Sequence, residues 1–312
     1  MDDPRTIIIK SLDIHSCRVE LSDSPIVLLC GGRVPQKDHP EDPEPPLASF
    51  RHALTRANSS YELFRPEEIT TWQSDGVYKN LMDFEADLAN ICTLVVIVLE
   101  SAGAIAELGA FSQLPELSKK IIAIKSNEFT GDPSFISLGI LRYIAEAHQS
   151  SVKTYPWEVA HPHTISNEVI DDAANDIKDE LDRLKKSHVF KINNGAHVIT
   201  LICSLIVLFV ALKESEILQY LNQLNISTGK PELRRMLFLL EKFNLVKRIE
   251  YSDSSFYIKG KDDHHGLRLA FTEGSTIDRL RISMDCMEFY NSSNSDRHRS
   301  RVIKISIDGG IE

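Results

Sequence analysis

Short unbroken hydrophobic runs mark the first half of the chain. Residues 25–30 (PIVLLC), 94–99 (LVVIVL) and 120–125 (KIIAIK) are three such runs, rich in aliphatic and β-branched residues. Runs of this length and composition are typical of strands that are buried on both faces of a parallel sheet. We therefore predict a strand at each run, and a shorter strand over residues 61–64.

Between these runs the hydrophobic residues recur at helical spacing. Phe50 and Leu54 do so within residues 48–58, and a helix over residues 78–90 has a core face made of Leu81, Phe84, Leu88 and Ile91. The resulting β-α-β-α-β order predicts an α/β domain with a Rossmann-like, mostly parallel sheet flanked by helices. Residues 34–47, rich in proline and acidic residues, predict a mobile surface loop that acts as a lid.

A proline-containing stretch and a charged helix follow the predicted sheet. Residues 150–162 contain Pro156 and Pro162 and predict a linker. Residues 164–186 predict a helix with an acidic start and a basic end, which suits the helix dipole. That helix either bridges two domains or pairs with another subunit.

The most apolar stretch of the chain is residues 196–212 (AHVITLICSLIVLFVAL). It contains His197, and it falls short of the ~20 residues that a membrane-spanning helix needs. We therefore predict a buried core helix of the second domain, and no membrane association.

The second domain is predicted to contain three helices followed by two strands. The buried helix comes first, and it is followed by helices over residues 214–224 and 231–243 and strands over residues 246–250 and 255–259. This is the order of a winged helix, a variant of the helix-turn-helix. A further helix is predicted over residues 276–290.

The two ends of the chain complete the predicted organisation. Residues 6–14 (TIIIKSLDI) predict an edge strand or a docking arm, and residues 291–301 (NSSNSDRHRSR) predict a flexible segment before the strand-like residues 301–307 (RVIKISI). The expected parts are an N-terminal arm (1–24), an α/β domain (25–155), a helical linker (156–193), a winged-helix domain with an extra helix (194–291) and a C-terminal tail (292–312).

Composition narrows the classes of function. The net charge of −10 argues against a protein that coats nucleic acid by itself. The five cysteines form no CxxC pair and no metal-binding spacing, so we expect reduced thiols, no disulfides and no metal. We also expect no cofactor. The acidic N-terminus, MDDPRT, lacks the charged-then-apolar order of a signal peptide, and we expect a cytoplasmic protein.

The candidate chemistry lies where the strand over residues 94–99 meets the next helix. Residues 100–103 (ESAG) predict a turn, the helix starts near Ala104, and Glu107 is then in its first turn. Helical side chains lean towards the helix N-terminus, so Glu107 should point into the crevice beyond the strand's carboxyl end, where open α/β sheets bind ligands. Glu107 is therefore either a charge that stabilises the helix or a catalytic carboxylate.

Residues near the first strand are further candidates. Gly31 and Gly32 follow that strand, and they either present backbone N–H groups to a ligand or simply end the strand. Cys30 is expected to be a core thiol rather than a nucleophile. Arg51, near the start of the next helix, either reaches a phosphate or is a solvated surface group.

The region around Glu107 resembles the nucleophile motif of the nucleoside deoxyribosyltransferase-like superfamily, a strand, a small-residue turn and a helix with E-[LI]-G. Residues 100–111 (ESAGAIAELGAF) are closer still to effector proteins encoded beside bacterial retron reverse transcriptases, which fuse such a domain to a C-terminal winged helix. Further matching pieces follow in the family's order: LCGG at 29–32, SFR at 49–51, FRPE at 64–67 and SFISLG at 134–139. Deoxyribosyltransferases usually carry an aspartate where this chain has Ser101, so base recognition is expected to differ.

The resemblance implies the toxin effector of a bacterial anti-phage retron system, which cleaves the N-glycosidic bond of a nucleotide, with NAD as the first substrate to test. Glu107 would be the catalytic carboxylate, with an acid from the helix over residues 78–90: Glu85 by the retron-effector spacing or Asp87 by the deoxyribosyltransferase spacing. Hydrolysis and transfer to a second base both remain open. The residues expected at the substrate are Cys30, Gly31, Gly32, Arg51, Pro66, Glu67, Glu85, Asp87, Ser101, Gly103 and Ser134, with the glycine turns taking the phosphates.

A basic cluster in the second domain predicts a phosphate-contacting face, although many winged helices bind protein instead. Its members are Lys230, Arg234, Arg235, Lys247 and Arg248. The resemblance implies that the reverse transcriptase and its multicopy single-stranded DNA with linked RNA hold the effector inactive, and that a homo-oligomer or filament forms. Two alternatives are a nucleotide-sensing module without turnover and a winged-helix DNA-binding regulator with a degenerate front domain.

Overall fold

The computed structural model describes residues 3–36, 39, 41–131, 133–147, 151–272 and 278–308. The chain is mixed α/β and forms two compact units. The first, here the sheet unit, consists of Asp23–Thr70 and Leu81–Leu184. The second, here the helical unit, consists of Met1–Ser22, Thr71–Asn80 and Lys185–Glu312.

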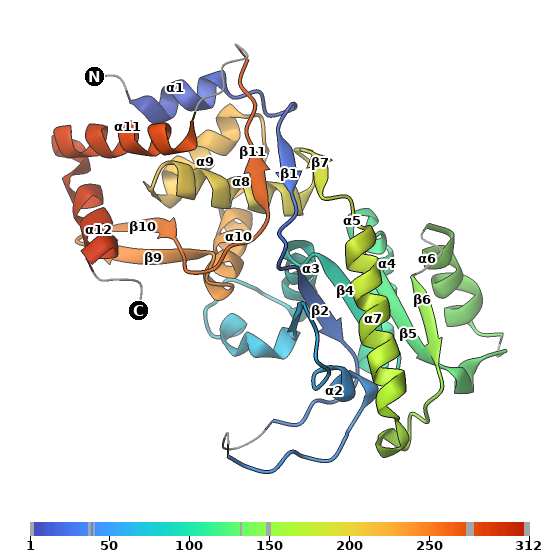
Figure 1. The fold of residues 1–312 in the computed structure, drawn as a ribbon. Helices are drawn as coiled ribbons and strands as arrows, with labels where there is room; N and C mark the ends of the chain where they lie inside the picture. Colours follow the sequence, from blue (N-terminus) through green and yellow to red (C-terminus); the bar gives the residue numbers. More distant parts are fainter. Residues whose placement is uncertain are drawn as a thin grey trace. The chain divides into compact units, whose positions relative to one another are not determined.

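A five-stranded parallel sheet forms the centre of the sheet unit (Figure 1). Its strands, in spatial order, are β3 (Glu62–Phe64), β2 (Ile26–Cys30), β4 (Leu94–Val98), β5 (Ile121–Ser126) and β6 (Val152–Tyr155). Every residue of β2 and β4 is buried, as their unbroken apolar runs predicted. The chain runs from β2 to one edge at β3 and then returns to β4 on the other side. Open parallel sheets bind ligands at such a reversal, beyond the carboxyl ends of the strands.

The fifth strand was not predicted. Residues 150–162 were expected to be a linker, but β6 pairs in parallel with β5, with Ala123 opposite Val152. The strand lies at the sheet edge and is only partly buried, so its sequence, VKTY, lacks the continuous apolar run that marks the central strands.

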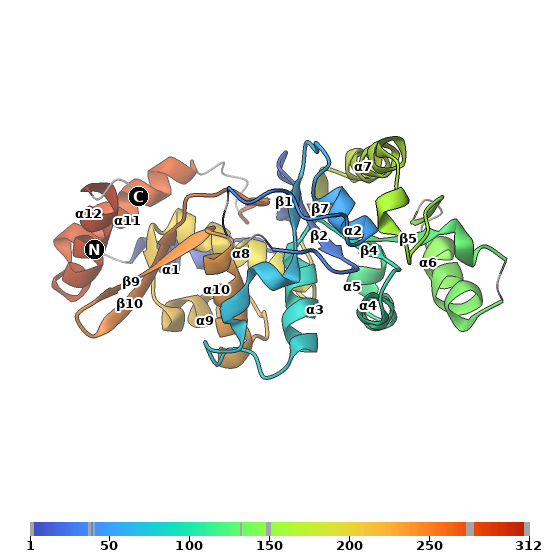
Figure 2. The same ribbon diagram turned by 90° about the horizontal axis from the view of Figure 1, so that it is seen from below.

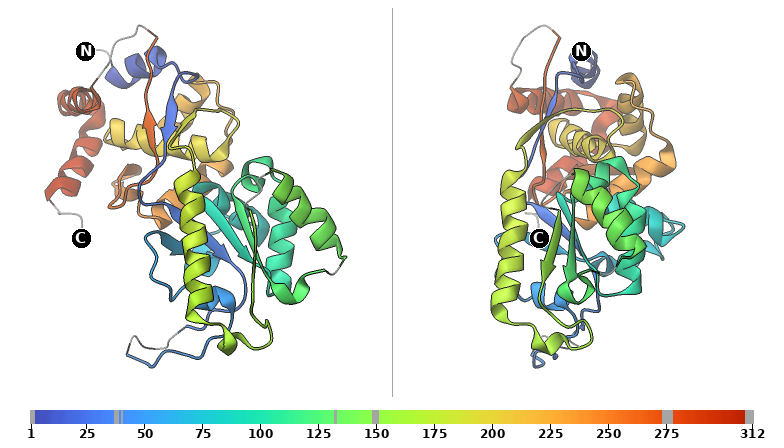
Figure 3. Two further views of the ribbon diagram at one scale, coloured as in Figure 1. Left: turned by 45° about the vertical axis from the view of Figure 1, so that its right-hand side comes forward. Right: turned by 90° about the vertical axis from the view of Figure 1, so that its right-hand side faces the viewer.

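Two layers of helices cover the sheet (Figures 2 and 3). One face carries α2 (Phe50–Leu54) and α7 (Asn167–Arg183), and the other carries α3 (Leu81–Ile91), α4 (Ala102–Ser112) and α5 (Pro115–Ser118). The charged helix α7 shares one core with α2, in which Ile170, Ala173 and Ile177 join Phe50 and Leu54. Most of the predicted linker helix is therefore part of the sheet unit.

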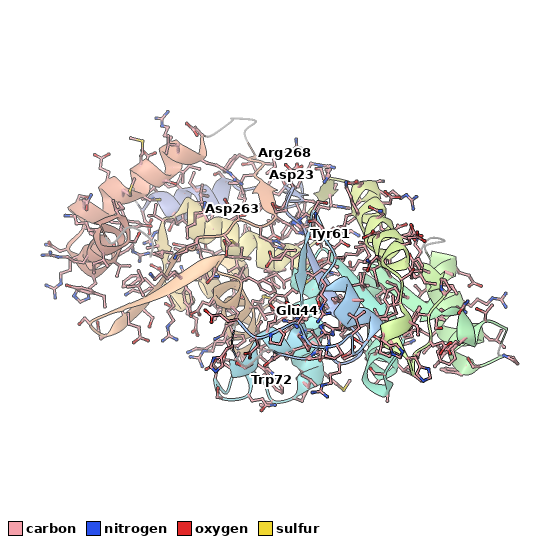
Figure 4. The ribbon with its side chains drawn as sticks, turned by 60° about the horizontal axis from the view of Figure 1, so that its bottom comes forward. Asp23, Glu44, Tyr61, Trp72, Asp263 and Arg268 are labelled. Carbon is pink, nitrogen blue, oxygen red and sulfur yellow. The ribbon has the colours of Figure 1, made fainter. Side chains whose placement is uncertain are left out.

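Side-chain contacts hold two loops of this unit in place, and Figure 4 labels one residue of each contact, Tyr61 and Glu44. The Tyr61 hydroxyl, just before β3, donates a hydrogen bond to the carbonyl of Ala174 on α7 at 3.1 Å. Glu44, in the loop predicted to be a lid, pairs with Arg56 at 3.3 Å. Leu81, predicted on the core face of α3, is 47% exposed because it begins the helix.

The remaining elements of the sheet unit are short. A π-helical turn, η4 (Ile136–Leu141), leads directly into α6 (Arg142–Ala147). The other short turns of the chain are η1 (Pro66–Glu68), η2 (Thr70–Trp72), η3 (Asn127–Phe129), η5 (Pro162–Thr164) and, near the C-terminus, η6 (Asn294–Asp296).

The helical unit contains three helices followed by a β-hairpin, in the order that we predicted. The elements are α8 (Gly195–Leu208), α9 (Glu214–Gln223), α10 (Lys230–Lys242), β9 (Val246–Tyr251) and β10 (Ser254–Lys259). One element was missed: α8 ends at Leu208, and a two-residue strand, β8 (Ala211–Leu212), pairs with β10. The apolar residues of α8 are mostly buried, as predicted. Within the described residues, no helix is both long enough and apolar enough to cross a membrane.

The strands predicted near the two chain ends are helices instead. Residues 4–11 form a helix, α1 (Pro4–Ser11), rather than an edge strand, because Asp3 caps the helix by accepting a hydrogen bond from the backbone N–H of Arg5 at 2.9 Å. A three-stranded sheet follows instead, with the order β11 (Gly266–Arg268), β1 (Arg18–Glu20) and β7 (Ser187–Val189). The helix predicted over residues 276–290 is confirmed as α11 (Arg279–Ser292), whereas α12 (Arg297–Asp308) lies where we predicted a flexible segment and a strand. Residues 276–277 of the predicted helix lie outside the described residues.

Arg299 holds the C-terminal helix α12 in place. Its side chain is 2% exposed and donates to the carbonyl of Ala211 at 2.6 Å, to Asp296 at 2.9 Å and to Glu216 at 3.0 Å. Arg5 of α1 donates to the same glutamate at 2.8 Å. A buried charge cluster thus ties both ends of the chain to α9.

Candidate functional site

The helix that carries Glu107 begins earlier than predicted. Ser101 is the N-cap of α4: its hydroxyl oxygen accepts a hydrogen bond from the N–H of Ala104 at 3.1 Å, and the hydroxyl donates to the carbonyl of Gly31 at 3.2 Å. The helix therefore starts at Ala102, and Glu107, its sixth residue, lies in the second turn rather than the first. The influence of the helix dipole falls off within the first turn, so it does little for Glu107.

Burial dominates the environment of the Glu107 carboxylate. It raises the pKa of Glu107, whereas a hydrogen bond from the Cys30 thiol and the charge of Arg51 oppose that rise. The second carboxylate oxygen, Oε2, is buried and has no hydrogen-bond partner among the described residues. A thiol and a guanidinium, rather than the N–H groups of the helix start, therefore favour the charged form of Glu107 against the cost of burial.

Arg51 is a buried cation that connects three segments around this carboxylate. The residue is 6% exposed, and its guanidinium donates to the carbonyls of Leu29 at 2.9 Å and Gly32 at 3.3 Å and to the Glu67 carboxylate at 2.7 Å. It is thus neither a solvated surface group nor a freely available one. Its bonds hold the end of β2 against η1.

The acid on α3 that couples to Glu107 is Glu85. Burial, followed by the charges of Glu107 and Glu67, raises the pKa of Glu85 to about 7, and Arg51 opposes the rise. Asp87 lies two residues further along α3, is half-buried, and is not among the groups that shift the pKa of Glu85 or Glu107. Three carboxylates and one guanidinium, from α3, α4, η1 and α2, therefore form one electrostatically coupled cluster, here the carboxylate cluster (Glu67, Glu85, Glu107 and Arg51).

Glu100, at the end of β4, was not singled out from the sequence. Its carboxylate accepts backbone N–H bonds from Gly32 at 3.0 Å, Phe50 at 2.7 Å and Arg51 at 2.9 Å. Burial raises its pKa, and these three bonds lower it. The sequence signal was a charged residue placed directly after an apolar strand, a position that buries a carboxylate next to free backbone N–H groups.

This arrangement explains Gly32 and changes its expected role. A Cβ at Gly32 would lie 2.8 Å from the Cβ of Ser49 and 2.9 Å from the Glu100 carboxylate, so the position needs a residue without a side chain. Its N–H is already bonded to Glu100, which stands where a ligand phosphate was expected. Gly31 also packs closely, since a Cβ there would lie 3.0 Å from the Cβ of Arg51.

The remaining predicted substrate residues are spread around the site. Cys30 is 1% exposed, and burial raises its pKa well above the usual range, so it is a thiol and a hydrogen-bond donor at neutral pH. Pro66 is buried at the start of η1, and Gly103 is exposed in the first turn of α4. Ser134 lies elsewhere, where its hydroxyl donates to that of Ser137 at 3.1 Å in the wall of a separate cavity.

The basic residues of the helical unit are largely matched by acids. Arg234 pairs with Glu214 at 3.1 Å and Lys230 with the same carboxylate at 3.8 Å, whereas Arg248 pairs with Glu250 at 2.6 Å. Lys247 is exposed and forms no ion pair with a described residue. The guanidinium of Arg235 lies 6.0 Å from the centre of the Tyr78 ring.

A segment from between β3 and α3 covers part of α10. The ring of Tyr78 lies 5.8 Å from that of Phe238, and its hydroxyl is 3.5 Å from the carbonyl of Arg235. Asp75 pairs with Lys242 at 3.4 Å. Thr71–Asn80 thus belongs to the helical unit although the sheet unit flanks it in sequence. A cavity of about 950 Å³, lined by this segment and by basic residues of α10, lies beside it.

Two proteins of Escherichia coli are similar to parts of this chain. The "Retron Ec73 putative ribosyltransferase/DNA-binding protein" is 36% identical over 85 residues, 27% of each chain. The "Retron Ec86 putative ribosyltransferase/DNA-binding protein" is 29% identical over 130 residues, 40% of this chain and 39% of that one. The chain therefore matches well under half the length of either relative.

A solved structure and a protein family complete the comparisons. The "Structure of Drosophila ORC bound to AT-rich DNA and Cdc6" aligns over 85% of this chain and 86% of that chain, at 13% identity and a TM-score of 0.20, which is too low to indicate a shared fold. Residues 47–248, more than half of the chain, match the family described as "STM3845 retron effector protein". The chain belongs to the STM3845 retron effector protein family.

Proposed function

We propose that this protein is the toxin effector of an anti-phage retron system and that it cleaves the N-glycosidic bond of a nucleotide, with NAD as the first substrate to test. Membership of a retron effector family and the names of the two E. coli relatives, both described as a ribosyltransferase/DNA-binding protein, support the class of reaction. The sheet unit would be the Rossmann-like, deoxyribosyltransferase-like catalytic domain.

The observation that carries the proposal is the carboxylate of Glu107, which accepts a hydrogen bond from Cys30 and whose buried Oε2 has no hydrogen-bond partner among the described residues. Cleavage of an N-glycosidic bond passes through an oxocarbenium-like state at C1′, and a carboxylate beside that carbon stabilises the charge or attacks it. An unpartnered buried oxygen is costly unless substrate charge compensates it. We infer that the developing positive charge at C1′ is what Glu107 faces.

The need for Glu85 as a general acid would distinguish two classes of substrate. Burial and the neighbouring carboxylates raise its pKa to about 7, so Glu85 can hold a proton near neutral pH, which suits a general acid. A neutral nucleobase needs a proton in order to leave, whereas the cationic nicotinamide of NAD becomes neutral as it departs. If cleavage requires Glu85, the substrate is therefore expected to be a nucleoside. If cleavage does not require Glu85, NAD is the expected substrate.

The helical unit would assemble the effector with its partners. The order α8, β8, α9, α10, β9 and β10, with the sheet order β8-β10-β9, supports a winged helix. The proposed partners are the reverse transcriptase and its multicopy single-stranded DNA with linked RNA, which hold the toxin inactive. The basic side chains of α10 would contact phosphates only after their acidic partners give way.

The test is base release by the purified protein, freed from its partners. Nicotinamide release from NAD is measured by chromatography, with deoxynucleosides and their phosphates run in parallel and with a second base added to detect transfer. Glu107→Gln should abolish release, whereas Glu146→Gln, the matched change at a carboxylate that is 66% exposed on α6, should leave it unchanged. Full activity in folded Glu107→Gln overturns the mechanism. No release from any substrate by the unmodified protein favours the nucleotide-sensing alternative.

A further inference from the structure

A second cavity lies on the other side of α4 from the carboxylate cluster. It has a volume of about 460 Å³ and is lined by the turn at residues 99–102, Lys125 at the end of β5, and residues of η3 and η4. Ile105 of α4 lines it, whereas Glu107 does not. Two residues along a helix correspond to a rotation of about 200°, so these side chains point to opposite sides of α4.

The lining of this cavity suits a flat, partly polar ligand. Its walls are mainly apolar, and they are made of Leu99, Ile105, Phe129, Ile136, Leu141 and Val159. The hydroxyls of Ser134 and Ser137 face each other at 3.1 Å in the wall. A volume of this size lies within the ~300–1,000 Å³ that is usual for small-molecule sites.

Lys125 supplies the charge selectivity. It forms no ion pair with any residue in the described part of the chain. Glu100, the one acid among the described residues that line the cavity, already accepts hydrogen bonds from three backbone N–H groups and is not available to neutralise the ammonium. The ammonium suits a phosphate, the hydroxyls suit a ribose, and the apolar walls suit a nucleobase.

We propose that this cavity binds the non-reacting purine nucleotide half of a dinucleotide, while Glu107 acts on the other half. Such a ligand would cross the exposed first turn of α4 at Ala102 and Gly103, where a side chain added at Gly103 would meet nothing closer than 3.9 Å. Binding energy from this half would hold C1′ at Glu107, so the enzyme would select dinucleotides over mononucleotides. The reaction at Glu107 rests on the proposed function, whereas binding of the nucleotide in the cavity does not depend on it.

Turnover of NAD and of nicotinamide mononucleotide, which lacks the second half, tests the selectivity. Ile105→Trp fills the cavity from α4, and Ala106→Trp adds the same bulk to the next, exposed residue outside it. We expect Ile105→Trp to lower kcat/KM for NAD by about tenfold or more while leaving the mononucleotide value within about twofold, and Ala106→Trp to change neither. An equal loss for both substrates in Ile105→Trp overturns the proposal.

Calorimetric binding of AMP decides the proposal without any turnover. AMP should bind to the unmodified protein and to Glu107→Gln with the same affinity, and binding should be lost in Ile105→Trp and weakened about tenfold in Lys125→Met. Absence of AMP binding to the unmodified protein, or undiminished binding to both cavity variants, overturns the proposal. If AMP binds as expected but no base is released from any substrate, the cavity assignment stands and the proposed reaction fails.

Discussion

Both units bury charged side chains, but the two clusters have opposite electrostatics. In the helical unit, partial burial of Glu216 would raise its pKa, yet the hydrogen bonds and charges of Arg299 and Arg5 lower that pKa. In the sheet unit, burial and repulsion between the carboxylates outweigh the charge of Arg51, so the pKa values of Glu85 and Glu107 are raised. The first cluster is a matched ion network that joins helices.

The difference supports the catalytic role that we propose for the carboxylate cluster. Matched buried charges are costly to disturb and offer nothing to a ligand. The carboxylate cluster has three acids around one guanidinium, a carboxylate oxygen that no described residue hydrogen-bonds, and an acid with a pKa of about 7. Perturbed acids of this kind concentrate at active sites. We therefore expect changes in the first cluster to affect folding and changes in the second to affect turnover.

The largest effect on folding is expected for Arg299→Met. It removes the guanidinium from Glu216, Asp296 and the carbonyl of Ala211, and breaking a buried pair in this way costs about 3–5 kcal/mol. Urea denaturation measures the loss. Arg301→Met, at an exposed position of the same helix, should change the free energy of unfolding by less than about 0.5 kcal/mol. Equal stabilities for the two variants would mean that the network does not hold α12.

Glu107→Gln should have the opposite effect to Arg299→Met, with a large loss of turnover and little change in folding stability. We expect turnover to fall by at least about a hundredfold, or ~2.7 kcal/mol of barrier, because the negative charge beside C1′ is lost. Folding should change little, since Oε2 makes no hydrogen bond to a described residue that the substitution could break. Thermal denaturation of the same preparation is the control. A variant that unfolds in step with its loss of activity would place Glu107 with the structural charges.

Glu85 predicts a pH dependence of stability. Its folded pKa, about 7, is above its ordinary value of 4.5, so the folded state retains the proton that the unfolded state loses first. This contribution is fully present below about pH 4.5 and is lost as the pH rises to about 7 and beyond. Denaturation between pH 4 and pH 8 should show a shallower decline in Glu85→Gln than in the unmodified protein or in Asp87→Asn. Identical slopes would remove Glu85 from the coupled cluster.

The same variant tests the leaving group. Glu85→Gln should lower cleavage of neutral nucleosides by about a hundredfold or more if Glu85 is the general acid, and should change NAD cleavage little. Parallel loss on both substrates would instead indicate that Glu85 positions the ribose.

The smallest effect is expected at the basic face of α10. Reversing Arg234 and Arg235 to Glu should weaken co-purification with the reverse transcriptase and its DNA and should lower the salt dependence of binding. The change should be modest for Arg234, because Glu214 already neutralises it. Binding that is unchanged across a salt series would leave no role for nucleic acid at this face.

The sequence alone determined the parts of the fold that depend on local pattern. The strands β2, β4 and β5 are continuous apolar runs because both faces of a central parallel strand are buried. The burial of α8 and the hairpin of β9 and β10 followed in the same way from periodicity and turns. The position of Glu107 beyond a central strand also needed no tertiary information, because chain order alone places a strand end next to the helix that follows it.

Tertiary contacts decided what local pattern leaves open. The strands β1, β7 and β11 have three residues each and exist because segments far apart in sequence pair. Residues 301–307 alternate like a strand, yet they form a helix because Arg299, Val302 and Ile303 bury one helical face. At the site, the partners of Glu107 come from β2, α2 and α3, so its raised pKa, the coupling to Glu85 rather than Asp87, and the anchoring of Glu100 depend on packing between those elements. Desolvation and charge coupling act through space, and no spacing along the chain encodes them.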